Sequence, residues 1–209
     1  MSDEYLYAYG IIENEEIDAS IEGVEGATRA YTIDHRTLSA VVSDIETMDP
    51  EQTDENVRAH DDVLQTIMFW EGGRTVVPMQ FGMTFKSARP LKSILRGGRR
   101  AFVRALQDMD GMIELGVKLL IDEDATVDRD AVREFTVEQL AAASEQEAKN
   151  DLFSDRLIIN RSYLVDREEQ AAFETAVDAI TEEYGDTVTV QYTGPWAPYN
   201  FIDIEISSQ

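Results

Sequence analysis

The order of apolar segments in this 209-residue chain predicts an α+β fold, with helices packed on antiparallel sheets. Segments rich in β-branched and aromatic residues are interspersed with longer segments whose apolar residues recur at helical spacing. The composition, with 43% hydrophobic and 9% aromatic residues, supports hydrophobic cores rather than disorder.

The first half of the chain begins with predicted strands. Tyr5–Ile12 is rich in β-formers and indicates a buried strand. Ala30–Ile33 and Leu38–Ser43 follow as a hairpin, with the polar residues 34–36 as its turn. Thr75–Val77 is a short strand that ends before a proline.

A helix is predicted between these strands, from an N-cap at Asp54 to about Glu71, where two glycines end it. Its apolar positions are Val57, His60, Leu64, Ile67 and Met68. A second helix is expected to begin after Ser87, with Pro90 in its first turn and a kink or break at residues 97–98. Its inward residues are Leu91, Ile94, Leu95, Phe102 and Leu106.

The second half repeats the mixture of strands and helices. Met112–Ile121, Leu157–Val165 and Val188–Tyr192 are predicted strands, and the alternation of Phe201–Ile206 indicates a half-buried final strand. One helix opens at Asp128, and its apolar positions are Val132, Val137, Leu140, Ala141 and Ala148. Another helix starts near Asp166 and ends at Gly185, with the apolar stripe Phe173, Ala176, Val177, Ile180 and Tyr184.

The charge composition indicates a protein adapted to high salt. The formal net charge is −24, and only four of the 18 basic residues are Lys. Dense carboxylates keep a surface hydrated, and molar salt screens their repulsion to a length of about 3 Å. The same charge argues against nucleic acid as a partner.

One segment departs from this acidic background. Residues 72–107 contain no Asp or Glu and eight of the 18 basic residues, whereas all 42 acidic residues lie outside. Six of these cations recur at helical spacing and are the predicted partner-binding residues: Arg89, Lys92, Arg96, Arg99, Arg100 and Arg104. They are expected to dock an acidic surface, either on this chain, where Asp122, Glu123 and Asp124 are available, or on a partner.

The sequence offers no catalytic, cofactor-binding or metal motif. Zero Cys excludes thiolate metal sites and disulfides. The acidic run at residues 122–128 resembles a calcium loop but has Val127 where that loop needs Gly. His35 falls in the predicted turn, and His60 on an apolar stripe is expected to be structural. The chain lacks an apolar run of about 18 residues, so no membrane span or membrane partner is expected.

Several segments resemble the gas vesicle protein F/L family. These are the opening Leu6–Ile11, the helical His60, Thr75–Phe85 with its Pro and Phe-Gly, Gly111–Lys118, and Gly-Pro-Trp-Ala-Pro-Tyr-Asn-Phe at 194–201. The motif residues are His60, Pro78, Phe81, Gly82, Glu114, Lys118, Pro195, Trp196, Pro198 and Tyr199. Two departures are Met83, where the family usually has Thr, and the glycine pair at 97–98 in a helix that is usually more regular and more acidic.

The resemblance implies two α/β-sandwich domains, 1–110 and 111–209, the first ferredoxin-like. It also implies a non-enzymatic, cytoplasmic accessory or minor structural protein of gas vesicles, and the acidic, Lys-poor composition suggests a haloarchaeal member. Such a protein would bind the small hydrophobic shell protein and other accessory proteins and assist vesicle assembly. A ferredoxin-like ligand-binding regulatory module remains an alternative, as does an enzyme whose carboxylates cannot be picked out among 42 acids.

Overall fold

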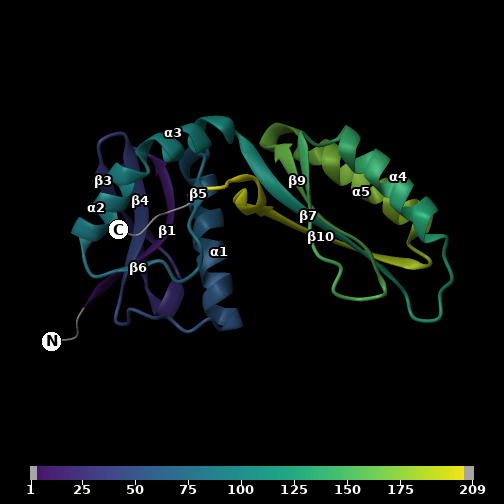
Figure 1. The fold of residues 1–209 in the computed structure, drawn as a ribbon, viewed down its shortest axis with the longest axis horizontal. Helices are drawn as coiled ribbons and strands as arrows, with labels where there is room; N and C mark the ends of the chain where they lie inside the picture. The colour runs from purple at the N-terminus through teal and green to yellow at the C-terminus, as the bar shows by residue number, and fades with distance from the viewer. Residues whose placement is uncertain (1–3, 205–209) are drawn as a thin grey trace. The chain divides into compact units, whose positions relative to one another are not determined.

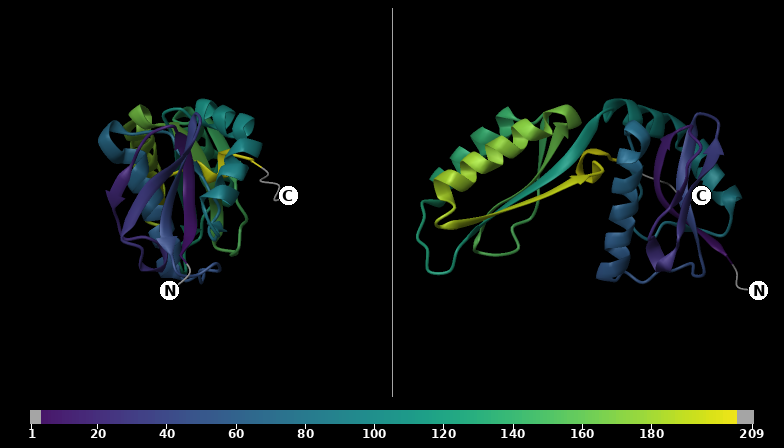
Figure 2. Two further views of the ribbon diagram at one scale, coloured as in Figure 1. Left: turned by 90° about the vertical axis from the view of Figure 1, so that its left-hand side faces the viewer. Right: turned by 180° about the vertical axis from the view of Figure 1, so that it is seen from behind.

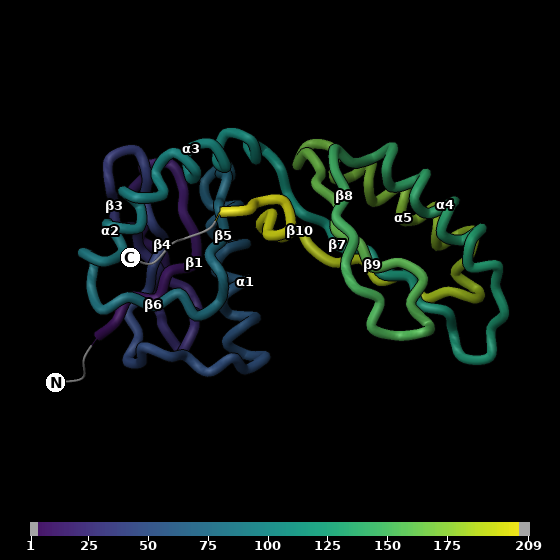
Figure 3. The backbone as a smooth tube through the Cα atoms, viewed as in Figure 1, coloured from purple at the N-terminus to yellow at the C-terminus, as the bar shows by residue number. Residues whose placement is uncertain are grey.

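The computed structural model describes residues 4–204, which fold into two compact units (Figure 1). The first unit contains residues 4–110 and 197–204, and the second is Gly111–Trp196. The chain therefore leaves the first unit once and returns to it, as the tube in Figure 3 traces. The predicted domains place the boundary at 110 but assign the returning residues to the second domain.

The first unit is built on one antiparallel sheet. Its strands run in the order β2-β3-β4-β1-β5, and β6 also pairs with β1. The strands are β1 (Tyr5–Glu13), β2 (Asp18–Ser20), β3 (Arg29–His35), β4 (Leu38–Ile45), β5 (Val77–Pro78) and β6 (Thr84–Phe85). The central strand β1 is buried along most of its length because helices cover both faces of the sheet (Figure 2).

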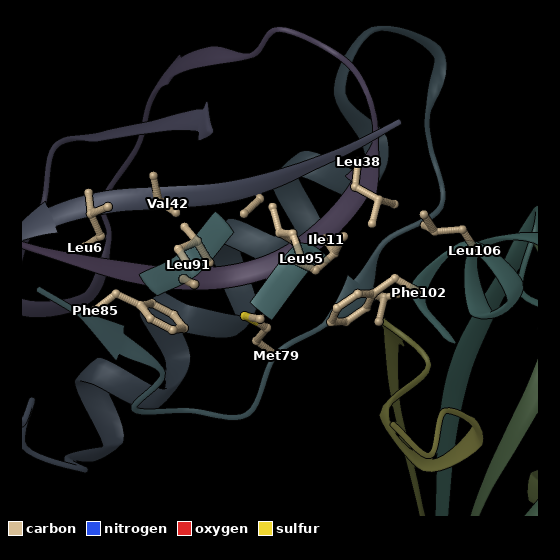
Figure 4. Close-up of a cluster of buried hydrophobic side chains, with 13 residues drawn as sticks. Leu6, Ile11, Leu38, Val42, Met79, Phe85, Leu91, Leu95, Phe102 and Leu106 are labelled. Atoms are coloured by element: carbon tan, nitrogen blue, oxygen red, sulfur yellow. The ribbon is translucent and has the colours of Figure 1, made fainter. Parts of the chain in front are cut away.

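The two faces of β1 hold different cores. Tyr7 and Tyr9 face helix α1 (Asp54–Phe69), and their rings lie 5.6 Å from that of His60. Leu6 and Ala8 face helices α2 (Ala88–Gly97) and α3 (Arg99–Asp108). That second core includes Met79, Phe85, Leu91, Leu95, Phe102 and Leu106 (Figure 4). The short 3-10 helices of this unit are Val24–Gly26, Trp70–Gly72 and Tyr199–Phe201.

The second unit has helices on one face of a four-stranded antiparallel sheet of order β10-β7-β9-β8. Its elements are β7 (Met112–Ile121), α4 (Arg129–Ala142), β8 (Gln146–Lys149), β9 (Leu157–Asp166), the 3-10 helix Arg167–Glu169, α5 (Gln170–Tyr184) and β10 (Val188–Trp196). The alternate residues Ile113, Leu115, Val117 and Leu119 of β7 are fully buried. Asp128 caps α4 as predicted, because its carboxylate accepts hydrogen bonds from the backbone N–H groups of residues 130 and 131.

The predicted α+β class with antiparallel sheets and packed helices is confirmed. The first unit places four strands before its first α-helix, an order that differs from the alternating β-α-β-β-α-β arrangement of ferredoxin-like folds. The ferredoxin-like description therefore stays an expectation. No helix among residues 4–204 is long and apolar enough to cross a membrane.

Several local predictions are wrong. The N-cap of α1 is Thr53, whose hydroxyl accepts from Asn56 N, and Asp54 is the first helical residue. The β3–β4 turn consists of residues 36 and 37, so His35 ends a strand. Helix α4 stops at Ala142, and the predicted helical position Ala148 belongs to strand β8.

The predicted final strand is also wrong for its described part. Residues 199–201 form a 3-10 helix, and residues 202–204 are irregular. Ile202 and Ile204 pack against the core of α2 and α3. Their alternating pattern therefore reflects burial of these two side chains, although residues 202–204 form no β-strand. Residues 205 and 206 of that prediction lie outside the described residues.

Candidate functional site

The predicted partner-binding residues lie on two consecutive helices of the first unit. Leu91 and Leu95 of α2 and Phe102 and Leu106 of α3 point into the core, which turns the opposite side of both helices outward. The helices meet at Gly98, where a Cβ would lie 2.6 Å from the ring of Phe102. The predicted break at the glycine pair is therefore confirmed, and tight packing accompanies it.

Most of the predicted cations are solvent-exposed. Arg89, Lys92, Arg96, Arg100 and Arg104 are exposed, and Arg99 is half-buried. We call these six residues the basic surface. Within the described part of the first unit, its one ion pair joins Arg104 to Asp108 at 3.3 Å, between two largely exposed side chains. Such a pair contributes little stability, so the basic surface remains available to an acidic partner.

Arg74 belongs to the same acid-free segment but has a structural role. Its side chain is 11% exposed, forms an ion pair with Glu15 at 3.0 Å and donates to the carbonyl oxygen of Trp70 at 3.0 Å. This contact ties the end of α1 to the loop after β1. Arg74 is therefore a packing residue.

A groove of about 620 Å³ runs beside the first of the two helices. We call it the α2 groove; its lining residues are His35, Ala88, Arg89, Lys92, Ser93 and Arg96. It has no acidic lining residue, and its one described internal hydrogen bond joins Arg96 to Ser93 Oγ at 3.3 Å. The Nε2 atom of His35 is shielded from solvent without a hydrogen-bond partner among the described residues. The groove therefore suits an anionic ligand.

The acids expected to dock the basic surface internally have interactions in their own unit. Asp122 accepts a hydrogen bond from Thr189 Oγ1 at 2.6 Å, and Glu123 pairs with Arg156 at 3.2 Å. Both acids follow strand β7. Internal docking through these residues stays a prediction.

His60 is the centre of a buried polar network in the first unit. Its Nε2 lies 3.1 Å from the carbonyl oxygen of Met79, which can only accept, so Nε2 carries the proton. Its Nδ1 then accepts from the hydroxyl of Tyr7 at 2.8 Å, and that hydroxyl accepts from Gly82 N. The hydroxyl of Tyr199 lies 2.9 Å from Nε2. Every polar atom of the imidazole is therefore satisfied.

Burial sets the proton affinities in this network. Desolvation lowers the pKa of His60 to about 4, so the ring is neutral at pH 7. Desolvation also raises the pKa of Tyr7 and of Asp61, which accepts from Tyr199 at 3.2 Å. A neutral His with both nitrogens occupied holds structure together, consistent with the expected role of His60.

The other motif residues of the first unit surround this network. Pro78 pairs with Gly10 in the sheet, and Gly82 has φ of +87°, a conformation that favours glycine. The ring of Phe81 lies 6.0 Å from that of His60. Pro198 precedes the short helix that carries Tyr199. Gly82 and Phe81 contact the network directly, and none of these residues belongs to the basic surface.

The motif residues of the second unit lie on two neighbouring strands. Glu114 of β7 is buried and opposes Trp196 of β10 in the register, and Pro195 follows a cis peptide bond. Lys118 places its ammonium group 5.5 Å from the centre of the Phe153 ring. The structure thus separates the family motifs into two clusters, one in each unit.

Sequence reasoning missed one exposed segment, the loop between β8 and β9. It carries Leu152 and Phe153, which are 52% and 70% exposed. The two residues are adjacent and belong to no periodic pattern, so they predicted neither a helix nor a strand. Two large apolar residues between Asp151 and Asp155 could nevertheless have indicated a surface contact. Within residues 4–204, no group of three or more acidic or His side chains could hold a metal ion.

Comparison with known proteins identifies the family. The model of the family described as "Gas vesicle synthesis protein GvpL/GvpF" matches residues 5–136 and 128–203. The chain is 57% identical to gas vesicle protein F of Haloferax mediterranei over 208 residues, covering 100% of this chain and 97% of that protein. It is also 57% identical over 206 residues to gas vesicle protein F1 of Halobacterium salinarum, with 99% and 96% covered.

Solved structures show the same fold at low identity. The crystal structure of GvpF from Microcystis aeruginosa superposes with a TM-score of 0.85 at 19% identity, covering 96% of this chain and 99% of that one. GvpF from Anabaena sp. PCC7120 gives 0.82 at 18% identity, with 97% and 99% covered. The family match, the haloarchaeal relatives and the shared fold agree along nearly the whole chain, so this chain belongs to the gas vesicle protein family GvpL/GvpF.

Proposed function

We propose that this gas vesicle protein is an accessory or minor structural component that binds the small hydrophobic shell protein and assists vesicle assembly. The basic surface is the proposed docking site. In this role the protein is not an enzyme and acts in the cytoplasm and at the vesicle, together with other accessory proteins.

One observation carries the proposal: a chain of net charge −24 keeps an acid-free segment with six cations on α2 and α3, five of them exposed. Five exposed cations, of which only Arg104 has an ion pair among the described residues, repel one another, which costs stability unless a partner compensates. No large apolar side chain of α2 or α3 is exposed, so the cations and their aliphatic stems would make the proposed contact. At molar salt the screening length is about 3 Å, and only directly contacting charges contribute.

The experiment is capture of the purified shell protein by this chain at about 2 M KCl. The Arg96→Glu/Arg100→Glu variant should lose most of the bound shell protein. Both side chains are exposed and have no ion pair in the described part of their unit, so the fold should survive. Arg58→Glu/Lys149→Glu, which changes the charge equally at two other exposed positions, should bind normally.

Equal capture by both double variants would refute the basic surface as the docking site. Loss of capture in both would show that net charge rather than this surface governs binding. Capture by neither the variants nor the original chain would refute the proposed function itself. Unfolding midpoints of all three proteins must agree for the comparison to hold.

A further inference from the structure

The loop between β8 and β9 presents an apolar pair to solvent. Leu152 and Phe153 have the highest exposed fractions among the large hydrophobic residues at positions 4–204, 52% and 70%. Asp151 and Asp155, both exposed, flank them without an ion pair in the described part of the second unit. We call residues 150–156 the Leu-Phe loop.

Hydrogen bonds anchor both ends of the Leu-Phe loop despite its exposure. At its start, Asn150 N donates to the carbonyl oxygen of Asn160 at 2.9 Å, and Asn160 Nδ2 donates to that of Asp151 at 2.8 Å. At its end, Leu157 N donates to the carbonyl oxygen of Ser154 at 3.0 Å. A loop fixed before binding loses less conformational entropy when a partner covers it, which favours its use as a contact.

The ring of Phe153 receives support from the sheet beneath it. Lys118 of β7 places Nζ 5.5 Å from the ring centroid, within the range of a cation–π contact. One side of the ring is therefore occupied, whereas the side chain remains 70% exposed. Phe is among the aromatic residues that are enriched at protein interfaces relative to the rest of the surface.

The α2 groove has the complementary chemistry. Its three cations, Arg89, Lys92 and Arg96, lie on the same helix within about 10 Å of one another along the axis. Their aliphatic stems and Ala88 provide apolar surface, and their charged ends provide partners for carboxylates. Guanidinium groups also stack on aromatic rings. An apolar pair flanked by two carboxylates matches such a groove in both respects.

We propose that this protein self-associates head to tail, with the Leu-Phe loop of one copy bound in the α2 groove of a second copy. Phe153 and Leu152 pack between the stems of the groove residues, and Asp151 and Asp155 pair with the cations. The two surfaces differ, so each copy offers one loop and one groove, and the contact either closes into a ring or extends a chain.

Charge complementarity and the exposed apolar pair together select a second copy of this chain as the occupant. Charge alone gives the acid-free groove little preference for one part of the chain's surface over another, because acidic residues are abundant along the sequence. The Leu-Phe loop adds two exposed large apolar side chains, a combination found at no other pair of adjacent residues in the described chain. Apolar contact persists at high salt, where long-range attraction between charges is screened.

The test is sedimentation of the full chain at about 1 M KCl, which suppresses the repulsion between copies of net charge −24. The average mass should rise above the 23.6 kDa of the monomer between about 10 μM and 1 mM protein, the range of weak contacts. Phe153→Ala should abolish the rise. Phe69→Ala, which removes another exposed ring, should leave it unchanged. A mass fixed at the monomer value overturns the proposal.

A charge-exchange pair makes the test specific. Arg89→Asp/Arg96→Asp reverses the groove, and Asp151→Arg/Asp155→Arg reverses the loop, so each variant alone should remain monomeric. An equimolar mixture restores complementarity, since the acidic groove of one meets the basic loop of the other. Recovery of association in the mixture supports the contact. Variants that still self-associate alone, or a mixture that stays monomeric although the original chain associates, overturn it.

This inference goes beyond the proposed function and can fail separately from it. Sedimentation uses the chain alone and needs no shell protein, whereas capture of shell protein can be measured at a concentration where the chain is monomeric. If both contacts exist they share Arg89, Lys92 and Arg96, so excess shell protein should lower the self-associated mass fraction of this chain.

Discussion

The hydroxyl of Tyr199 lies 2.9 Å from Nε2 of His60, although 139 positions separate these two residues in the chain. The same hydroxyl donates to Asp61 at 3.2 Å. A side chain from the last described segment thus completes a polar network on the first helix. Such networks contribute specificity because each buried member requires its partners.

Replacing Tyr199 by Phe should lower the free energy of unfolding by about 1–2 kcal/mol, because His60 and Asp61 each lose a partner. Urea unfolding measures the change. Tyr184→Phe is the matched control, since that hydroxyl makes no hydrogen bond among the described residues. Equal stability of the two variants would contradict the importance of the Tyr199 hydroxyl.

The contribution of His60 should depend on pH. Burial lowers its pKa from 6.5 to about 4, so between these values the folded state binds fewer protons than the unfolded state. Stability therefore rises with pH in this window; the contribution is complete above about pH 6.5 and is lost as the pH falls toward 4.

The measurement compares the original chain with His60→Gln, which cannot titrate, at pH 7.5 and 5.5. The stability advantage of the original chain should shrink at the lower pH, by at most about 1.4 kcal/mol for each pH unit below 6.5. A constant difference between the two proteins would show that His60 titrates normally.

Adding a methyl group at the junction of α2 and α3 should have opposite effects at adjacent positions. At Gly98 a Cβ would lie 2.6 Å from Phe102, so Gly98→Ala should destabilise the fold although Ala favours helix. At Gly97 nothing lies within 4 Å, so Gly97→Ala should be neutral or stabilising by up to about 1 kcal/mol. Thermal unfolding midpoints decide this, and equal midpoints would refute tight packing at Gly98.

Stability should increase with salt. The chain has 42 acidic against 18 basic residues, and its self-repulsion extends over about 10 Å at 0.1 M salt. The thermal midpoint should therefore be higher at 2 M than at 0.1 M KCl. An identical midpoint in both would refute the interpretation of the composition as an adaptation to salt.

The sequence predicted the elements whose own residues determine them. Strand β7 has the predicted bounds because its alternate residues are all apolar, and α2 and α3 are divided at the predicted glycines. Strand β8 was missed because Gln146–Lys149 is mostly polar and exposed. Its pairing with β9 depends on neighbours that local composition does not reveal.

For the candidate site, too, the sequence predicted the features that depend on local residues and missed those that depend on distant ones. Helical spacing predicted that the cations lie on helices and outside the core, which is a local property, and five of the six are exposed on α2 and α3. The contribution of His35 to the α2 groove depends on how the β3–β4 hairpin packs beside α2, and the partners of His60 come from β1 and residue 199. Contacts between such distant positions cannot be obtained from periodicity.

The return of residues 197–204 to the first unit determines the order in which the chain can mature. The second unit is one continuous stretch, so all its strands are available once Trp196 has been synthesised. The first unit must wait for Tyr199, which is synthesised after the whole second unit, before His60 acquires its last partner. A truncated product that stops at Trp196 would thus contain every residue of the second unit, yet leave the interior of the first unfinished.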